Sequence, residues 1–286
     1  MVQKLLQTIE ENMAGFSKGQ RAIAKYIIEN YEKAAYMTAA SLGSQTGVSE
    51  STVVRFALKL GFEGYPEMQR ALQELTRTKL TSVQRMEVTN TLIGNADILA
   101  KVLLSDIDKI RRTLDEIDRE VFYRAVDKIA TARNIYIIGV RTSASLAGFL
   151  NFSLKMIFDN VRLIQTTSGS EIFEQLLSME KEDVMIAISF PRYSKRIINA
   201  VAFARSRGAV VIALTDSAKS PIAGYADQLL TACSDMASFV DSLVAPLSII
   251  NAMIVALTRK KSDELKERLR ELEKIWDEYD VYDKNS

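Results

Sequence analysis

Residues 38–61 have the sequence TAASLGSQTGVSESTVVRFALKLG, in which two short helical patterns meet at Gly47. We predict that one helix begins at about Thr38 and a second at Ser49. Glycine can take the positive φ of the tight turn between them. Ala40 is small enough to let the two helices approach closely, and Val48 would point into the gap. The stretch therefore predicts a helix-turn-helix.

The second helix of this motif carries most of the candidate DNA contacts. Either Ser49 or Ser51 can cap it, and its buried stripe is predicted to comprise Val53, Ala57, Leu60 and, as a further candidate, Phe56. In a helix-turn-helix the early exposed residues of the second helix meet base edges in the major groove. Arg55 is the candidate for a bidentate guanine contact, and Lys18 and Lys59 are candidates for phosphate contacts. The predicted DNA-binding residues are Lys18, Ser49, Glu50, Ser51, Thr52, Arg55 and Lys59.

Composition does not decide between DNA binding and its alternatives. The formal net charge of +1 means that a DNA-binding surface must come from local placement of lysine and arginine. Alanine and glycine are common at helix junctions, so the motif could also be a helical hairpin of an accessory or protein-interaction domain. The agreement of cap, turn and buried stripe along one segment favours DNA binding.

The surroundings of the motif predict two domains. Residues 1–77 show helical periodicity throughout, and Ser17 followed by Gln20 has the pattern of a capping box. Residues 78–105 are polar with weak periodicity and are predicted to be a linker and connecting helix. Residues 106–286 form the second predicted domain.

The second domain alternates short apolar runs with amphipathic segments. The runs lie at 134–139, 161–165, 183–189, 209–215 and 227–231, and two of the helical segments at 143–158 and 194–207. This alternation predicts a five-stranded parallel sheet covered by helices on both faces. The apolar stretch 243–257 is interrupted by polar residues and is too short for a membrane span, so we expect a buried helix there. The charged helix expected at 262–279 packs on the core or, alternatively, contacts a second subunit.

Two loops of this domain carry hydroxyl and basic side chains directly after predicted strands. Arg141 and Ser143 follow the first predicted strand, and Ser189, Arg192 and Ser194 lie at and after the end of the third predicted strand. The carboxyl ends of parallel strands and the N-termini of the following helices are favourable places for anions. Each serine taken singly is explained by helix capping. Two such loops at one edge favour a bound phosphate.

Several kinds of chemistry are disfavoured by composition. The chain has no histidine and one cysteine, Cys233, so we expect neither a metal site of the usual kind nor a disulfide. This cysteine usage, the charged start of the chain and the lack of a predicted membrane span indicate a cytoplasmic protein. The first loop lacks the glycine spacing of a dinucleotide site, and no cofactor is expected.

Both halves of the chain resemble the RpiR family of bacterial regulators, which join a helix-turn-helix domain to a sugar isomerase (SIS) domain. The resemblance covers nearly the whole chain. It rests on residues 16–24 and 47–56, on Gly61 and Gly64 with their aromatic neighbours, and on 138–143 and 188–194. It implies a phosphate-holding role for Ser143. In the loop that resembles Ser-x-Ser-Gly-x-Thr, Ser189 and Ser194 match the first serine and the threonine, whereas Pro191 and Arg192 replace the middle serine and glycine.

The resemblance implies a transcriptional regulator of sugar or amino-sugar metabolism that senses a phosphorylated sugar. The predicted sugar-phosphate ligands are Arg141, Ser143, Ser189, Arg192 and Ser194. We expect a homodimer or homotetramer that binds palindromic operator DNA. The rival hypothesis is a sugar-phosphate isomerase in which Glu171 or Glu174 acts as base. The absence of histidine argues against it, and both glutamates are also explained by favourable charge near a helix N-terminus.

Overall fold

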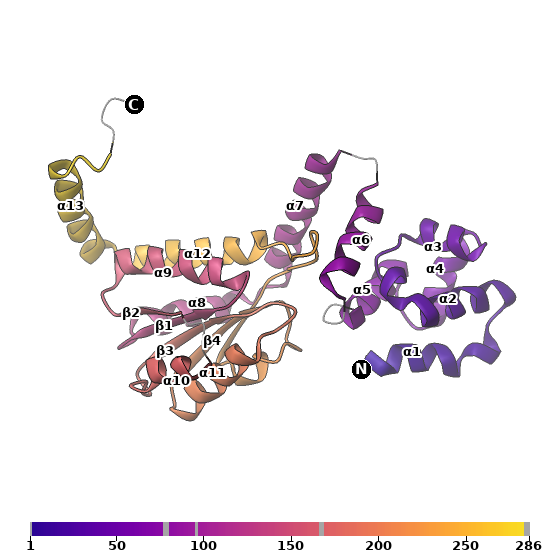
Figure 1. The fold of residues 1–286 in the computed structure, drawn as a ribbon, viewed down its shortest axis with the longest axis horizontal. Coiled ribbons are helices and arrows are strands. Elements are labelled where there is room, and N and C mark those ends of the chain that lie inside the picture. The colour runs from indigo at the N-terminus through magenta and orange to yellow at the C-terminus, as the bar shows by residue number, and fades with distance from the viewer. Residues whose placement is uncertain (1, 77–79, 95–96, 166–168, 283–286) are drawn as a thin grey trace. The chain divides into compact units, whose positions relative to one another are not determined.

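The computed structural model describes residues 2–76, 80–94, 97–165 and 169–282. The chain divides into two compact units. The first comprises residues 1–101 with 236–240, and the second comprises residues 102–235 with 241–286. Each unit is described separately, and their elements are labelled in Figure 1. The segment predicted to be a linker and connecting helix contains one helix and the first part of another.

The described part of residues 2–94 in the first unit is helical, whereas residues 236–240 of this unit are not. Its elements are α1 (Val2–Glu11), η1 (Met13–Gly15), α2 (Lys18–Ala34), α3 (Ala39–Thr46), α4 (Glu50–Lys59), α5 (Tyr65–Thr76) and α6 (Ser82–Ile93). The predicted capping box at Ser17 is confirmed, since Ser17 Oγ accepts the Gln20 N–H and the Gln20 side chain accepts the Ser17 N–H. A shared core holds α1 to α5 together, and its fully buried members include Ile9, Ile23, Ile27, Leu42, Phe56, Met68 and Leu72.

The second unit is built on a five-stranded parallel sheet, as predicted. Its strands are β1 (Ile135–Gly139), β2 (Val161–Ile164), β3 (Val184–Ile188), β4 (Val210–Thr215) and β5 (Gln228–Thr231), in the order β2-β1-β3-β4-β5. Alternate residues of each strand point to opposite faces, so that Ile135 and Ile137 join one core cluster and Tyr136 and Ile138 the other. Both faces are therefore buried, which explains the continuous apolar runs in the sequence.

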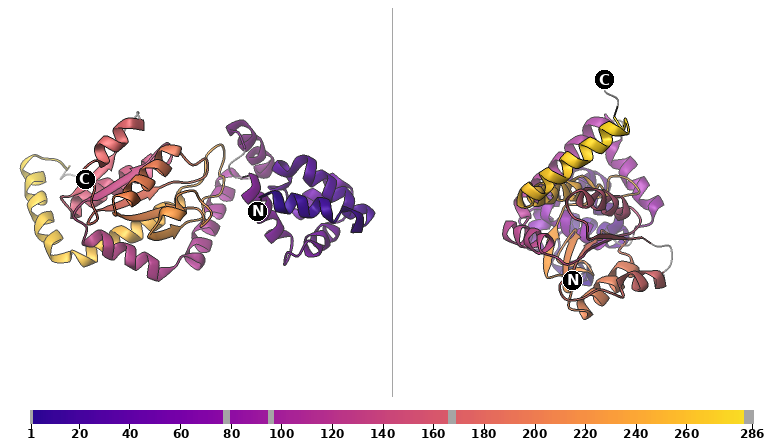
Figure 2. Two further views of the ribbon diagram at one scale, coloured as in Figure 1. Left: turned by 90° about the horizontal axis from the view of Figure 1, so that it is seen from below. Right: turned by 90° about the vertical axis from the view of Figure 1, so that its left-hand side faces the viewer.

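Helices cover both faces of the sheet. On one face α8 (Arg119–Ala130), α9 (Ser143–Ile157) and α12 (Val244–Lys260) share a core with the strands, and on the other face α10 (Gly169–Leu176) and α11 (Lys195–Ser206) do so (Figures 1 and 2). The predicted buried helix near the C-terminus is α12, whose buried residues include Ile250 and Met253. In the described part of the chain, no helix combines the length and apolarity that crossing a membrane requires.

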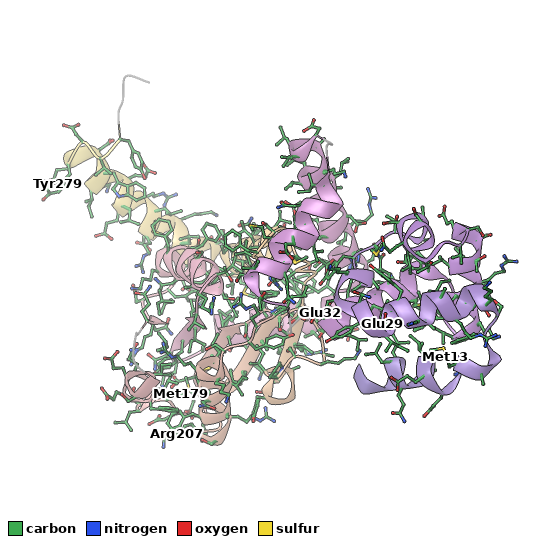
Figure 3. The ribbon with its side chains drawn as sticks, turned by 45° about the vertical axis from the view of Figure 1, so that its right-hand side comes forward. Met13, Glu29, Glu32, Met179, Arg207 and Tyr279 are labelled. Atoms are coloured by element: carbon green, nitrogen blue, oxygen red, sulfur yellow. The ribbon has the colours of Figure 1, made fainter. Side chains whose placement is uncertain are left out.

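The charged tail forms α13 (Ser262–Glu278) and is only partly packed on the second unit. Leu265 is buried and Leu269 packs beside it on the core, while Arg268 pairs with Asp159 and donates to the Lys155 carbonyl oxygen at 3.1 Å. Tyr279, at the far end of α13, is 72% exposed and lies away from the sheet (Figure 3). The predicted packing on the core is therefore seen in the first half of this helix. Its second half has an exposed face, and the alternative, contact with a second subunit, stays a prediction.

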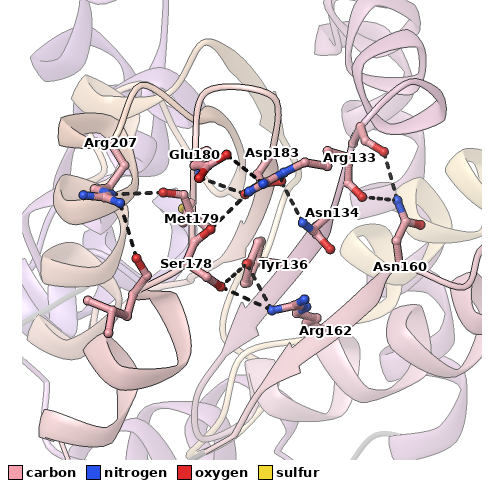
Figure 4. Close-up of polar contacts among 12 residues, drawn as sticks. Arg133, Asn134, Tyr136, Asn160, Arg162, Ser178, Met179, Glu180, Asp183 and Arg207 are labelled. Atoms are coloured by element: carbon pink, nitrogen blue, oxygen red, sulfur yellow. Dashed lines mark hydrogen bonds and ion pairs between the residues drawn. The ribbon is translucent and has the colours of Figure 1, made fainter.

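A buried carboxylate joins the segments that enter β1 and β3 at the amino-terminal edge of the sheet (Figure 4). Arg133 donates from Nε to Asp183 Oδ1 at 2.9 Å and from Nη2 to Oδ2 at 2.7 Å. Asn134 Nδ2 and the Glu180 backbone N–H also donate to Asp183, at 3.0 and 2.8 Å. Burial alone would raise the pKa of Asp183, but these hydrogen bonds outweigh it and lower the pKa below its usual range. This network fixes the strand entries at the edge opposite the predicted ligand loops.

Candidate functional site

The turn between α3 and α4 is shaped by two glycines. Gly47 has φ +70° and ψ +30°, and the N–H groups of Gly47 and Val48 donate to the carbonyl oxygens of Ser44 and Gly43 at 3.3 and 2.9 Å. This is the glycine-dependent helix ending expected of a left-handed cap. Gly43 allows the close approach of the second helix, since a Cβ there would lie 2.8 Å from the Val48 carbonyl oxygen. The prediction that Ala40 has this role is wrong, because Ala40 is exposed.

Replacing Gly43 with alanine should destabilise the first unit by about 1–3 kcal/mol, the usual range for overpacking in a close contact. The added methyl would meet backbone rather than a flexible side chain, so relief requires α3 and α4 to move apart. Thermal denaturation should show this loss of stability as a lower melting temperature. The same variant should also bind DNA more weakly. Gly15→Ala is the matched control, because nothing lies within 4 Å of a Cβ at Gly15. Equal melting temperatures for the two variants would contradict this account of the turn.

The first turns of α4 present a polar face. Ser49, Glu50, Ser51 and Arg55 are exposed and Thr52 is half-buried, while Val53, Phe56 and Ala57 are buried and Leu60 is partly buried. Ser49 occupies the N-cap position, but its hydroxyl bonds to the side chains of Ser51 and Thr52 at 2.9 Å and not to a backbone N–H. The expected side-chain cap is therefore replaced by a cluster of hydroxyls at the start of the helix.

Arg55 and the two candidate lysines differ in how they are held. Arg55 bends back along α4, with Nε donating to the Ser51 carbonyl oxygen at 3.3 Å and Nη2 to Thr52 Oγ1 at 3.4 Å. Lys18 is exposed at the start of α2, where a Cβ on the next residue, Gly19, would lie 3.6 Å from Thr52 Cγ2. The starts of α2 and α4 are thus neighbours.

Lys59 has a structural role of its own. Its ammonium donates to the Gly15 carbonyl oxygen and lies 5.5 Å from the centre of the Phe16 ring, which in turn packs on Phe56 with ring centres 5.1 Å apart. These contacts tie the end of α4 to the loop before α2. Unlike Arg55, whose bonds stay within α4, Lys59 uses its charge to join two parts of the first unit.

The predicted phosphate loops lie at one edge of the sheet. β1 and β3 are neighbours, and Gly139 at the end of β1 is in register with Ile188 at the end of β3. The loops that follow lead into α9 and α11, whose N-termini therefore face the same edge from opposite sides of the sheet. Two helix N-termini at one edge provide free N–H groups and partial positive charge for an anion.

The first loop brings Ser143 against the strand it follows. A Cβ on Gly139 would lie only 2.5 Å from the Ser143 carbonyl oxygen, so glycine is needed for α9 to begin this close to β1. Ser143 is the first residue of α9 and is 4% exposed. Arg141 is exposed and has φ +57°, a left-handed conformation unusual for a residue with a side chain.

The second loop likewise contains a buried serine and an exposed arginine with a left-handed backbone. Ser189 is buried and its N–H donates to the Leu214 carbonyl oxygen at 3.1 Å. Arg192 is exposed with φ +68°, at the position where the family pattern has glycine, so the loop keeps a glycine-like conformation without glycine. Ser194 caps α11 by accepting the Arg196 N–H at 3.3 Å. The helix-capping explanation therefore accounts for Ser194, but not for Ser143, which lies inside α9.

Asp216, directly after β4, was not among the predicted site residues. Tyr193 Oη donates to its two carboxylate oxygens at 2.8 and 2.9 Å, and Thr215 Oγ1 donates at 3.0 Å. These bonds tie the loop after β3 to the end of β4, at the same edge as the two serines. The sequence signal for Asp216 was a polar pair, Thr215-Asp216, at the end of a buried strand.

Arg192→Gly and Arg192→Ala should separate the conformation of this loop from its chemistry. Both remove the guanidinium, and only glycine relieves the left-handed backbone. The glycine variant should be more stable than the alanine variant by about 1 kcal/mol. If Arg192 contacts phosphate, both variants should lose about tenfold or more in phosphate-ligand affinity. Denaturation curves and ligand titrations on both variants test this, and equal stabilities would contradict a left-handed Arg192.

Glu171 and Glu174 lie on α10, and both side chains are exposed. Within the described ranges, no group of three histidine, cysteine, aspartate or glutamate side chains is arranged to hold a metal ion.

Two family models match separate parts of the chain. Residues 3–79 match the helix-turn-helix domain of the rpiR family, and residues 128–256 match the SIS domain. The matched ranges include the α3–α4 turn and both loops at the carboxyl edge of the sheet.

Relatives align with nearly the whole chain. A helix-turn-helix transcriptional regulator of Clostridium perfringens is 24% identical over 270 residues, which cover 92% of this chain and 95% of the relative. The regulator HexR of Pseudomonas aeruginosa is 24% identical over 277 residues, 95% of each chain. These relatives are transcriptional regulators, not enzymes.

Solved structures with the same fold cover both halves. The NanR protein of Vibrio vulnificus, in complex with ManNAc-6P, is 25% identical and covers 95% of this chain and 97% of its own, with a TM-score of 0.57. The sugar isomerase domain of an RpiR transcription factor from Sphaerobacter thermophilus is 27% identical, covers 61% of this chain and 97% of its own, and has a TM-score of 0.59.

Proposed function

The chain belongs to the RpiR family of helix-turn-helix transcriptional regulators, and from this membership we propose that it regulates sugar or amino-sugar metabolism by sensing a phosphorylated sugar. The protein acts in the cytoplasm as a homodimer or homotetramer. Two copies of its helix-turn-helix bind a palindromic operator, with half-sites one or more helical turns apart. The observation that supports the sensor part of this proposal is a pair of loops at one edge of the sheet. In these loops Arg141 and Arg192 have a left-handed backbone, and each loop leads into a helix N-terminus.

The proposed ligand site binds the phosphate group through both loops. Ser143 and Ser189 donate hydroxyl hydrogens to phosphate oxygens, Ser194 and the start of α11 supply a further donor surface, and Arg141 and Arg192 supply positive charge. Tyr193 and Asp216, joined by their hydrogen bonds, stand beside this group at the end of β4. Oxygen acceptors of Asp216 are suited to sugar hydroxyls, so this pair is the proposed contact for the sugar ring.

Binding of the ligand regulates DNA binding only if two arrangements of the protein differ in affinity for both partners. A sugar phosphate that favours one arrangement of the second unit must therefore change operator affinity. Reciprocally, operator DNA must change the affinity for the sugar phosphate by the same factor.

Titration calorimetry of the full-length chain with a panel of hexose and N-acetylhexosamine 6-phosphates tests the ligand site. We expect one member to bind, its unphosphorylated sugar to fail, and Ser143→Ala and Ser189→Ala to weaken binding about tenfold each. Ser153→Ala is the matched control, because Ser153 lies on the same helix as Ser143 and its hydroxyl donates to the Phe149 carbonyl oxygen of that helix. Binding that is unchanged in both serine variants, or absent for every phosphate, would refute the proposed site.

The rival isomerase hypothesis has a direct test of its own. Incubation of the bound sugar phosphate in deuterated water should give no exchange at the carbon next to the carbonyl if the chain is only a sensor. Exchange that is lost in Glu171→Gln or Glu174→Gln would instead identify an isomerase.

A further inference from the structure

The segment between β5 and α12 is shared by the two units of the chain. Its central residues, 236–240, belong to the first unit, and the residues on both sides of them belong to the second. The Ser242 N–H donates to the Asp235 carbonyl oxygen at 3.0 Å, which brings the two sides together. Residues 233–242 are therefore a hairpin whose ends lie in the second unit and whose tip lies in the first.

The hairpin begins at the edge of the sheet where the proposed ligand loops lie. Thr231, the last residue of β5, is in register with Thr215 at the end of β4. The Ala232 N–H donates to the Thr215 carbonyl oxygen at 2.9 Å, and Thr215 Oγ1 donates to the Asp216 carboxylate at 3.0 Å. Two hydrogen bonds through Thr215 thus connect the start of the hairpin with the proposed contact for the sugar ring.

The helix α7 (Ile98–Glu116) holds both ends of the hairpin. Arg112 Nη1 donates to Asp235 Oδ2 at 2.9 Å, on the side that leaves β5. Ser242 Oγ donates to Asp106 Oδ1 at 2.7 Å, on the side that enters α12. All four residues belong to the second unit. The ends are therefore fixed within that unit by one ion pair and one hydrogen bond to a carboxylate.

The tip of the hairpin contacts α6, a helix with few apolar anchors. Among the described residues, the apolar core of the first unit includes side chains of α1 to α5 and none of α6. The buried side chains described on α6 are Arg85 and Thr89, 2% and 7% exposed, and both are polar. Arg85 Nη1 donates to the Phe239 carbonyl oxygen at 3.5 Å, and Gln84 Nε2 donates to Glu32 Oε2 at 2.9 Å. Because most helices gain their stability from a packed apolar face, α6 depends on polar contacts of this kind.

We propose that the 233–242 hairpin is the regulatory link of this chain, which transmits changes at the ligand edge of the second unit to α6 in the first. The inference rests on the proposed function for the ligand and adds the element that transmits its effect. Every contact along the route is polar, so a shift of the hairpin can exchange these contacts while the apolar cores of both units stay intact. Release of the hairpin at one end must then change the stability of the helix held at the other end.

Hydrogen–deuterium exchange of the full-length chain, followed by mass spectrometry, tests the link from the second unit to the first. Asp235→Ala removes the partner of Arg112, so amides of α6 should exchange about threefold faster, while those of β3 should be unchanged. Asp127→Ala is the matched control. Asp127 pairs with Lys260 at 2.6 Å within the second unit and is 58% exposed, against 40% for Asp235. This control should leave the exchange of α6 unchanged.

A second pair of variants tests the reverse direction. Arg85→Ala removes the donor to the Phe239 carbonyl oxygen, so the hairpin, including its ends in the second unit, should exchange about threefold faster. The amides of α2 should keep their rates, which shows that the first unit remains folded. Arg70→Ala, at an exposed arginine on α5 of the same unit, should leave the exchange of the hairpin unchanged.

Equal exchange of α6 in Asp235→Ala and Asp127→Ala would overturn the proposal, and so would equal exchange of the hairpin in Arg85→Ala and Arg70→Ala. Acceleration that reaches β3 or α2 to the same degree would also overturn it, because the variant would then loosen a whole unit. The experiments contain neither DNA nor sugar phosphate. Failure of the link would therefore leave the proposed function standing, and failure of the proposed ligand would leave the link measurable.

Discussion

Asp183→Ala should destabilise the second unit by about 3 kcal/mol at neutral pH, the lower end of the range for breaking a buried ion pair. The carboxylate of Asp183 is fully buried and accepts hydrogen bonds from Arg133, Asn134 and the Glu180 backbone. Alanine leaves these donors without their acceptor at the entry to two central strands. The Arg133 side chain is 42% exposed, so water can solvate its guanidinium, which places the loss at the lower end. Chemical denaturation of the variant at pH 7 measures it.

Glu180→Ala is the matched control for this prediction. Glu180 binds the same arginine, with its Oε2 2.7 Å from Arg133 Nη1, but its side chain is 56% exposed. Ion pairs between exposed groups contribute about 0–1 kcal/mol, so this variant should be close to the unaltered chain. Comparable losses in both variants would contradict the account of the network.

The deficit of Asp183→Ala should also depend on pH. Because hydrogen bonds from Arg133 and its neighbours lower the folded-state pKa of Asp183 below the unfolded value, the carboxylate contributes stability above about pH 4. That contribution is lost as the pH falls through the folded-state pKa. The difference in unfolding free energy between the unaltered chain and Asp183→Ala should therefore be largest near pH 7 and shrink below pH 4. A difference independent of pH would mean that the variant acts through packing alone.

Arg55→Ala should weaken binding to the specific operator about 10–100-fold while leaving the fold intact, because one bidentate arginine–guanine contact contributes about 1–3 kcal/mol of discrimination. Arg55 is exposed on the early part of α4, and its guanidinium donates to the Ser51 carbonyl oxygen and the Thr52 hydroxyl. Those bonds can be exchanged for base contacts without opening the core. Fluorescence anisotropy with operator and unrelated duplexes at fixed salt measures the ratio of specific to non-specific affinity.

The control for Arg55→Ala removes the same charge elsewhere in the first unit. Arg70 is exposed on α5, so Arg70→Ala should leave the ratio of specific to non-specific affinity unchanged. An unchanged ratio in Arg55→Ala would assign the motif to protein interaction or to backbone contacts instead of base recognition.

The main features of the fold could be predicted from the sequence because each is set by local physical chemistry. The capping box at Ser17 and the positive φ of Gly47 depend on neighbouring residues alone. The strands are visible as apolar runs because both faces of the sheet are buried. By contrast, the close approach of the two helices was assigned to Ala40 when Gly43 permits it. Helical spacing places both residues near the junction, and only the crossing of the helices decides which one faces the partner.

The candidate ligand site was predictable only in part. Ser143, Ser189 and Ser194 follow strand ends that the sequence reveals, and the parallel sheet brings β1 and β3 together. Their role in binding phosphate stays a prediction. The Tyr193–Asp216 pair could not be predicted, since it joins residues 23 apart across two strands. The left-handed backbone at Arg192 was also hidden, because arginine seldom takes that conformation and only the family pattern places glycine there.

The central claim is that a sugar phosphate bound by the second unit alters specific DNA binding by α4. Selection of genomic fragments by the purified full-length chain at near-physiological salt, with and without a pool of sugar phosphates, tests it most directly. The account predicts recovery of a palindromic site beside sugar-metabolism genes, with its yield changed by one phosphate in the pool. Binding that is blind to sequence and falls steeply with salt, or a palindrome that no sugar phosphate affects, would contradict the claim.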